Sequence, residues 1–499
     1  MKPTGFLHWS LSLLLASTLA ACAVGPDYHQ PAAPQAALTP SPLPVQTQRA
    51  GGVAQVFAPG ADIAGDWWSL YHSPELDALI NAALAHNPNL QAAQATLLQT
   101  EENERADVGV LMPSVSAGFK VQGGQNSTDS VAGTGFAAST KPLPAYRLYN
   151  ASLSVSYALD IWGGARRGLE SAQAQTQYQR YELEAAYLSL TANIVTAAVQ
   201  EASLRAQIDA TNQVIGDERQ QLGILQSQLS LGGVAQASVL QEQATLAASE
   251  AALPPLQAAL AQARNQLAGY VGVVPGDFHE ADFTLDSLHL PDTLPVSVPS
   301  EIVAQRPDIQ AASAQLHVAS ANVGIADAQM LPQISLTADI GREAINTGDL
   351  FMPQTLLWSL VAGVTQPIFE GGQLSAKRKA ALAALQASGA QYQATVIGAF
   401  QNVADALSAL QYDALTLSAA DTAADAAAQS LALTQAQYRL GGQPLSAVLI
   451  AQTNYQNAAI AQVKASAARL VDTAALYQAL GGGWWHRSDV AVSCCGVIP

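Results

Sequence analysis

Apolar and polar residues alternate in three stretches of the chain, residues 113–123, 149–161 and 334–340. In the second stretch every odd-numbered position is apolar, and serine recurs at the positions between. A period of two predicts β-strands that have one apolar and one polar face. These stretches are therefore predicted to be strands with one face in an apolar environment and the other in a polar environment.

A fourth stretch, which begins at Leu356, is predicted to be a strand whose facing the pattern leaves open. The alternation places Trp358 and Leu360 on the apolar face of this strand. Alignment of the strand with the second stretch instead places Leu357 and Ser359 on the apolar face. The four stretches predict two β-hairpins, at about 113–162 and 331–370.

Two much longer segments, residues 164–230 and 372–440, are rich in Ala, Gln and Leu and contain no proline. They are predicted to be helices of ~100 Å, at 1.5 Å per residue. Each ends at a Leu-Gly-Gly turn and returns as a shorter helix, the first of which Pro254 and Pro255 are expected to break or kink. Alanine-rich helices of this length must pack side by side.

The second half of the chain repeats the first. AALAHNPNLQAAQ corresponds to IVAQRPDIQAASAQ, and SLGGVAQASVLQEQ corresponds to RLGGQPLSAVLIAQ. Each half is expected to fold as a helix, a hairpin and two long helices. The boundaries that we predict are a signal peptide at 1–21, an N-terminal anchor segment at 22–72, a first repeat at 73–270, a linker at 271–299, a second repeat at 300–483 and a tail at 484–499.

The first residues are typical of a bacterial lipoprotein signal. Lys2 precedes an apolar run that is too short to span a bilayer, and LAAC places Cys22 directly after small residues. Acylation of Cys22 would anchor the protein stably, since two or three chains are needed for that. A plain secretory signal with an incidental cysteine is the alternative.

An exported, lipid-anchored chain without a spanning helix can cross a membrane only as a barrel, because hydrocarbon satisfies no strand edge. A half-buried soluble sheet is the alternative interpretation of the strands. Four strands are too few for closure, since membrane barrels begin at about eight. A dimer would give eight strands, but the small polar residues of the inner face favour the open pore of a trimer. We therefore predict an internally duplicated α+β membrane protein, with a shared 12-stranded β-barrel continued by a periplasmic α-helical barrel.

Composition narrows the possible chemistry. The formal net charge is −17, which disfavours nucleic-acid binding. Three cysteines cannot form a disulfide framework, and the eight histidines lack metal-ligand spacing, so we expect no metal, cofactor or catalytic site. Trp67 and Trp68 are expected to pack the N-terminal segment against the body. Arg166 and Arg167 are interpreted either as residues near the membrane interface or as a solvated helix start.

Five sequence segments resemble the outer-membrane efflux (TolC-like) family, and more narrowly its NodT-type lipoprotein branch. They are CAVGPDYHQP, DWWSLYHSPELDALINAALAHNPNL, LPVSVPSEIVAQRPDIQAA and the two Leu-Gly-Gly turns. The resemblance implies a homotrimer in the outer membrane that extends into the periplasm. It also implies a periplasmic adaptor protein and an inner-membrane pump, often of the resistance-nodulation-division type, as partners. Such a channel exports small molecules passively, and a type I protein secretion channel is the alternative.

The same resemblance assigns site residues. The Tyr438-Arg439 pair before the second turn matches relatives, but the aspartates that often narrow the pore are absent. Constriction by Gln241 and Ile450 is our hypothesis in their place. The predicted adaptor-contact tips are Leu231, Gly232, Gly233, Leu440, Gly441, Gly442 and Gln443, and the predicted pore constriction is Ser238, Gln241, Tyr438, Ala447 and Ile450.

Overall fold

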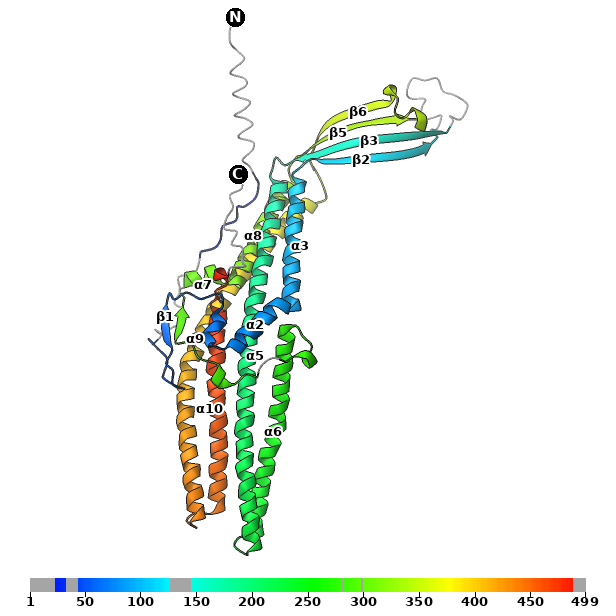
Figure 1. Cartoon of the computed structure of the whole chain (residues 1–499). Helices are drawn as coiled ribbons and strands as arrows, with labels where there is room; N and C mark the ends of the chain where they lie inside the picture. Colours follow the sequence, from blue (N-terminus) through cyan, green and yellow to red (C-terminus); the bar gives the residue numbers. More distant parts are fainter. Residues whose placement is uncertain (1–22, 33–43, 126–144, 280–281, 298, 488–499) are drawn as a thin grey trace. The chain divides into compact units, whose positions relative to one another are not determined.

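A computed structural model describes residues 23–32, 44–125, 145–279, 282–297 and 299–487 (Figure 1). The predicted signal peptide, Cys22, both C-terminal cysteines and most of the loop inserted in the first repeat lie outside the described residues. Among the described residues, no helix is both long and apolar enough to cross a membrane.

The elements follow the duplicated order that the sequence predicts. The α-helices of the described residues are α2 (Pro74–His86), α3 (Pro88–Val110), α5 (Gly164–Ser230), α6 (Gln236–Val271), α7 (Pro299–Gln305), α8 (Pro307–Ala328), α9 (Gln373–Arg439) and α10 (Leu445–Ala479). The strands are β1 (Val56–Pro59), β2 (Ser114–Gly124), β3 (Tyr146–Leu159), β4 (Thr293–Val296), β5 (Gln333–Ala344) and β6 (Leu356–Thr365). The two 67-residue helices, α5 and α9, are confirmed to within one residue of their predicted ends.

The chain divides into two compact units, each built from separate segments. The sheet unit lies within residues 1–30, 98–177 and 313–390, and the helical unit lies within residues 31–97, 178–312 and 391–499.

In the sheet unit, four antiparallel strands lie in the order β2, β3, β5 and β6 (Figure 1). Residues directly opposite in a ladder share a face, so the register shows how the fourth strand faces. Leu153 pairs with Ile340, and Ile340 pairs with Trp358. Trp358 therefore shares the apolar face, as does Leu360 opposite Ala338. The facing that the sequence left open follows from this register.

The opposite face of this sheet is polar and internally bonded. The Asp339 carboxylate accepts hydrogen bonds from Ser154 Oγ and, at 3.2 Å, from Ser359 Oγ. Further along the sheet, Asn150 Nδ2 donates to Glu343 Oε2 at 3.2 Å. The predicted division into an apolar and a polar side is confirmed for β2, β3 and β5, whereas in β6 Leu357 and Val361 lie on the same side as Ser359.

In the helical unit, residues 47–55 of the N-terminal segment are fixed to α10 by a buried arginine. Arg469 is fully buried and donates to Gln55 Oε1, to Thr47 Oγ1 and to the carbonyl oxygens of Ala50 and Val53, at 2.8–3.3 Å. The Arg469 guanidinium thus adds a charged donor to two side-chain oxygens and two backbone oxygens of this segment. The segment is therefore held by specific polar contacts and not by apolar packing alone.

The paired tryptophans complete this attachment. Trp67 and Trp68 are both buried, and the Trp67 ring stacks on Tyr477 with 5.4 Å between ring centroids. The prediction that they pack the N-terminal segment against the body is confirmed.

Of the break or kink predicted at Pro254 and Pro255, the break is wrong, because α6 continues through both residues. Both prolines are exposed, so the carbonyl groups that lose their helical N–H partners one turn earlier lie on a side of α6 that water reaches. The cost of the missing hydrogen bonds is thereby reduced.

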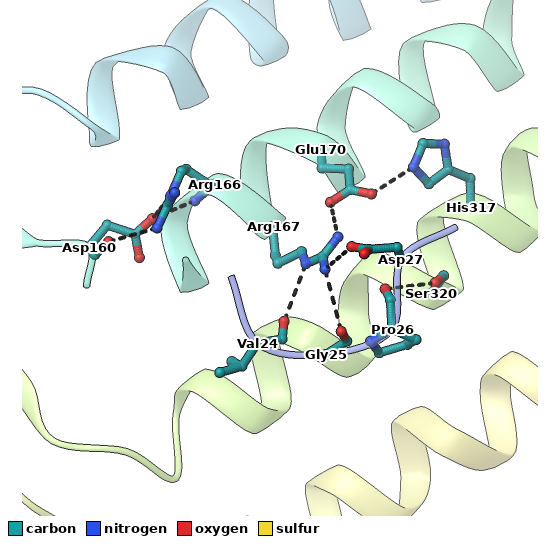
Figure 2. A network of polar contacts seen from close by, with 10 residues as sticks. All are labelled: Val24, Gly25, Pro26, Asp27, Asp160, Arg166, Arg167, Glu170, His317 and Ser320. Carbon is teal, nitrogen blue, oxygen red and sulfur yellow. Dashed lines mark hydrogen bonds and ion pairs between the residues drawn. The ribbon is translucent and has the colours of Figure 1, made fainter. Parts of the chain in front are cut away.

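The N-terminal segment of the sheet unit is held by Arg167, which lies in the first turn of α5 (Figure 2). Its buried guanidinium donates to Asp27 Oδ1 and Glu170 Oε2, each at 2.7 Å. It also donates to the carbonyl oxygens of Val24 at 3.3 Å and Gly25 at 3.5 Å. The hydrogen bond and charge of Arg167 lower the pKa of the Asp27 carboxyl. One side chain thus ties the segment that directly follows Cys22 to the end of the first hairpin.

Aromatic contacts extend this attachment. The Tyr28 ring stacks on His317 with 4.3 Å between centroids, and its hydroxyl hydrogen-bonds to Ser313 Oγ at 2.6 Å. His317 Nε2 lies 2.8 Å from Glu170 Oε1, so Glu170 contacts both His317 and Arg167 (Figure 2).

Glycine is required where this segment crosses α8. Gly25 has φ +96°, and a Cβ at this residue would lie 2.3 Å from the Cα of Gly324. Any side chain here would clash with backbone, so the two glycines permit a contact that no other pair allows.

The solvated helix start is the wrong interpretation for Arg167, because the guanidinium is buried against the N-terminal segment. Arg166 does remain exposed and contacts Asp160. A sequence pattern cannot show which of two adjacent arginines is buried when a distant segment of the chain covers one of them.

We predict that Arg167→Gln releases the segment. The Val24 N–H, which donates to the Trp162 carbonyl oxygen at 3.0 Å, is expected to exchange with solvent at least an order of magnitude faster, since several charge-assisted bonds are lost together. Hydrogen-exchange mass spectrometry measures this directly. Arg166→Gln is the matched control, and equal exchange in both variants would contradict the assignment.

Candidate functional site

Two sharp turns join the long helices of the helical unit to the helices that return. Gly232 follows α5 with φ +73°, and Gly441 follows α9 with φ +77°. The N–H of Gly233 donates to the Gln228 carbonyl oxygen at 2.8 Å, and the second turn repeats this bond from Gly442. Glycine is needed because the residue that ends such a helix adopts the left-handed conformation.

The residues before these glycines expose large apolar side chains. Leu231 is 86% exposed and Leu440 is 88% exposed. Nothing lies within 4 Å of the space that a Cβ would occupy at Gly232 or Gly441, so the turns are also open to close approach. Two exposed leucines at matching turns are typical of a surface that a partner covers.

Behind the turns, the helices pack through a small apolar cluster, the tip cluster. Its buried members are Leu225, Val239, Leu445 and Leu449. Because Leu225 lies on α5, Val239 on α6 and the other two on α10, the cluster joins the two helix pairs. Tyr438 of α9 packs against it, and its Oη lies 3.5 Å from Gln228 Oε1.

The residues predicted to narrow a pore differ in their surroundings. Gln241 and Ile450 are exposed, and Ser238 and Ala447 are half-buried. The Tyr438 ring packs against the tip cluster and is not a freely exposed side chain. Gln241 and Ile450 are thus the predicted constriction residues that can face a passing solute.

The sequence analysis missed a set of buried polar residues near the tip cluster. Glu242 is completely buried, Glu218 is 1% exposed and Gln452 is 4% exposed. The sequence did contain one indication of their burial, because each of the three residues lies one turn from an apolar residue of its own helix. That spacing alone does not distinguish a buried glutamate from a solvated one.

Within the part of the chain that the structure describes, no group of three or more His, Cys, Asp or Glu residues could hold a metal ion.

Comparisons with known proteins place these features in a family. The model of the family described as "Outer membrane efflux protein" matches residues 79–273 and 298–482, more than half of the chain. The Pseudomonas putida pyoverdine export outer membrane protein OpmQ is 28% identical over 84% of this chain and 88% of its own length. The probable efflux pump outer membrane protein TtgC of Pseudomonas putida is 28% identical over 95% of each chain.

A solved structure has the same fold. The open state of the Neisseria gonorrhoeae MtrE outer membrane channel superposes with a TM-score of 0.78 and is 26% identical, covering 93% of this chain and 99% of MtrE. The resemblance seen in the sequence is therefore confirmed. The chain belongs to the outer membrane efflux protein family, and it is an outer-membrane efflux channel and not an enzyme.

Proposed function

We propose that three copies of this chain form a passive conduit, the outer-membrane component of a tripartite efflux system. A periplasmic adaptor and an inner-membrane pump, of the resistance-nodulation-division type, deliver small molecules to it. The observation that carries the proposal is the four-stranded sheet of the sheet unit, which has one apolar face, one polar face and two unpaired edges. The named role of TtgC as an efflux pump outer membrane protein supports it.

The trimer follows from the free edges of the sheet. Among the described residues, β2 and β6 each pair with one strand only, so each has a row of backbone N–H and C=O groups without a strand partner. Hydrocarbon cannot satisfy such groups, so β6 of one copy must pair with β2 of the next. Three copies close a 12-stranded barrel with the apolar face toward lipid, wide enough for a pore.

The internal duplication supplies a specific register for this contact. Ser114 pairs with Ser156 in the first hairpin, as Gln333 pairs with Thr365 in the second. Positions 219 apart therefore correspond in β2 and β5, and positions 209 apart correspond in β3 and β6. Because β6 corresponds to β3 and β2 corresponds to β5, we expect β6 to pair with β2 of a neighbouring copy in the register that β3 and β5 have inside the chain.

This register places apolar residues opposite each other. Val155 and Ala338 are opposite each other in the chain, and their counterparts, Val364 and Phe119 of the next copy, are expected to lie opposite each other in the same way. The pair Leu159 and Ile334 becomes Ile368 opposite Val115, which extends β6 by three residues. These side chains are exposed in the single chain, Ile368 by 88%, as expected of residues that such a contact covers.

The two turns of the helical unit are proposed as the adaptor contact. Leu231 and Leu440 supply exposed apolar surface, and the adjacent glycines allow a partner to approach the backbone. Gly233, Gly442 and Gln443 complete this surface.

A narrow point of the channel is proposed at Gln241 and Ile450, the exposed members of the predicted constriction. An apolar side chain such as Ile450 impedes polar solutes by excluding water, whereas an acidic ring would act through charge.

Acylation of Cys22 is proposed to hold the channel in the outer membrane. Cys22 lies outside the described residues, but the segment that starts one residue later is fixed by Arg167. With at most ~3.6 Å per residue, the acyl chains stay within a few residues' reach of the end of β3.

The trimer register predicts a specific cross-link. With Cys494 and Cys495 replaced by serine, the double variant Val364→Cys with Phe119→Cys is expected to form covalent dimers and trimers, because opposite Cα atoms in a ladder lie within disulfide range. Non-reducing gels measure this. Val364→Cys with Val121→Cys is the out-of-register control. Preferential cross-linking of the control pair would overturn the register, and a lone subunit by native mass measurement would overturn the trimer.

The adaptor contact predicts a loss of export. Leu440→Asp is expected to weaken adaptor binding about 30-fold, corresponding to the ~2 kcal/mol of a central interface contact. In a strain whose own copy of the gene is deleted, drug susceptibility measures the result, and the variant should behave like the deletion. Leu433→Asp changes an exposed leucine of α9 away from the turn and should restore export fully. Normal export by Leu440→Asp would refute the contact.

The constriction predicts a change in conductance. Ile450→Ala shortens the side chain at the proposed narrow point and should raise single-channel conductance in planar bilayers, whereas Ile224→Ala on α5 should leave it unchanged. Unchanged conductance in the Ile450→Ala channel would remove Ile450 from the constriction.

A further inference from the structure

A layer of buried polar residues lies directly behind the tip cluster. Glu242 follows Val239 by three residues on α6, and Gln452 follows Leu449 by three residues on α10. A spacing of three places each polar residue on the same helix face as the apolar residue that joins the two helix pairs. The layer therefore belongs to the contact between the pair α5/α6 and the pair α9/α10.

Several acceptor atoms of this layer have no hydrogen-bond partner. Neither carboxylate oxygen of Glu242 has a hydrogen-bond partner, although the side chain is completely buried. Oε2 of Glu218 and Oε1 of Gln452 are also buried without a partner. Nε2 of Gln221 on α5 is a buried donor without a partner. A buried carboxylate with no donor is costly as an anion, and a bound proton removes the charge and supplies an O–H donor.

The charged groups around Glu242 provide no compensation. On α5, Glu218 is acidic, its Oε1 accepts a bond from Ser249 Oγ at 3.0 Å, and Asp217 is its neighbour. On α6, Glu250 pairs with Arg219 of α5 at 2.7 Å, so this arginine is engaged at the surface.

The second helix pair adds no cation either. From α9 the facing titratable group is Tyr438, whose pKa is raised by burial and by the nearby Glu242. From α10 the layer receives Gln452. Tyr455 follows three residues later, and the next cation along that helix is Lys464, about three turns from Gln452. No cation of the described residues around this layer is placed to neutralise Glu242.

We propose that Glu242 is a proton-binding site that controls how the two helix pairs pack at the end of the helical unit. With the proton bound, Glu242 donates to an oxygen of the layer and the pairs stay together. When the proton leaves, an unpaired anion beside Glu218 favours separation of the pairs and entry of water. The effect on solute flow rests on the proposed channel function, whereas the packing change does not.

The direction of the pH dependence follows from burial. Burial and the charge of Glu218 raise the pKa of Glu242 from 4.5 to about 7. The packed state thus holds a proton that a hydrated carboxyl would release, so packing is fully favoured below about pH 4.5 and weakens as the pH rises toward 7. The same end of the molecule is expected to be tight at mildly acidic pH and loose above neutrality.

Hydrogen exchange of the full-length protein, corrected for the intrinsic rate at each pH, tests the proposal between pH 5.5 and 8.5. In the unchanged protein, protection of the amides of residues 236–249 should fall about tenfold or more across this range. Glu242→Gln should stay protected throughout, since its amide carries donors and no charge. Glu250→Gln, at an exposed position of the same helix, should follow the unchanged protein.

A second variant keeps the test decisive if Glu242→Gln misfolds. Glu218→Gln removes a neighbouring charge that raises the pKa of Glu242. The proton of Glu242 should then leave at lower pH, and the fall in protection between pH 5.5 and 8.5 should be smaller than in the unchanged protein. Protection that is independent of pH in the unchanged protein, or a transition unaffected by both variants, would overturn the proposal. Neither outcome bears on the cross-link that tests the trimer.

Discussion

The backbone groups along the outer edges of β2 and β6 set the main constraint on this protein. Four antiparallel strands satisfy each other internally, but within the part of the chain that the structure describes they leave two rows of N–H and C=O groups without a strand partner. Because the same sheet has a continuous apolar face, from Leu153 through Ile340 to Trp358, these edges cannot simply be left to water. The free edges and the apolar face together make the single chain an incomplete structure, and the proposed trimer completes it.

Duplication explains much of the architecture, but the two copies are used differently. Gly232 and Gly441 end equivalent helices with the same left-handed geometry. In contrast, only the first copy has Arg167 at its helix start, and Ser375 occupies the corresponding position of the second copy. Residues 24–27, which Arg167 holds, precede the first copy and have no counterpart before the second copy.

The buried acidic residues follow the same asymmetry. Glu242 corresponds to Ala451 in the second repeat, where a small apolar side chain fills a buried position. The acid pair of Glu218 and Glu242 is therefore not required by the helical packing itself, which the second repeat achieves with alanine. A buried carboxylate that is costly for stability and absent from the equivalent position is best explained by a role in changing the packing.

The sequence by itself determined the element order, the duplication, the two 67-residue helices, the glycine turns and the two-faced strands, because each depends on local periodicity or on a single residue's backbone preference. Only the tertiary structure decided the facing of β6, the burial of Arg167 beside the exposed Arg166, the continuity of α6 through Pro254, and the burial of Glu242. These features depend on which distant segment lies against a residue and on whether water reaches it. Spacing along one helix or strand carries no information about either.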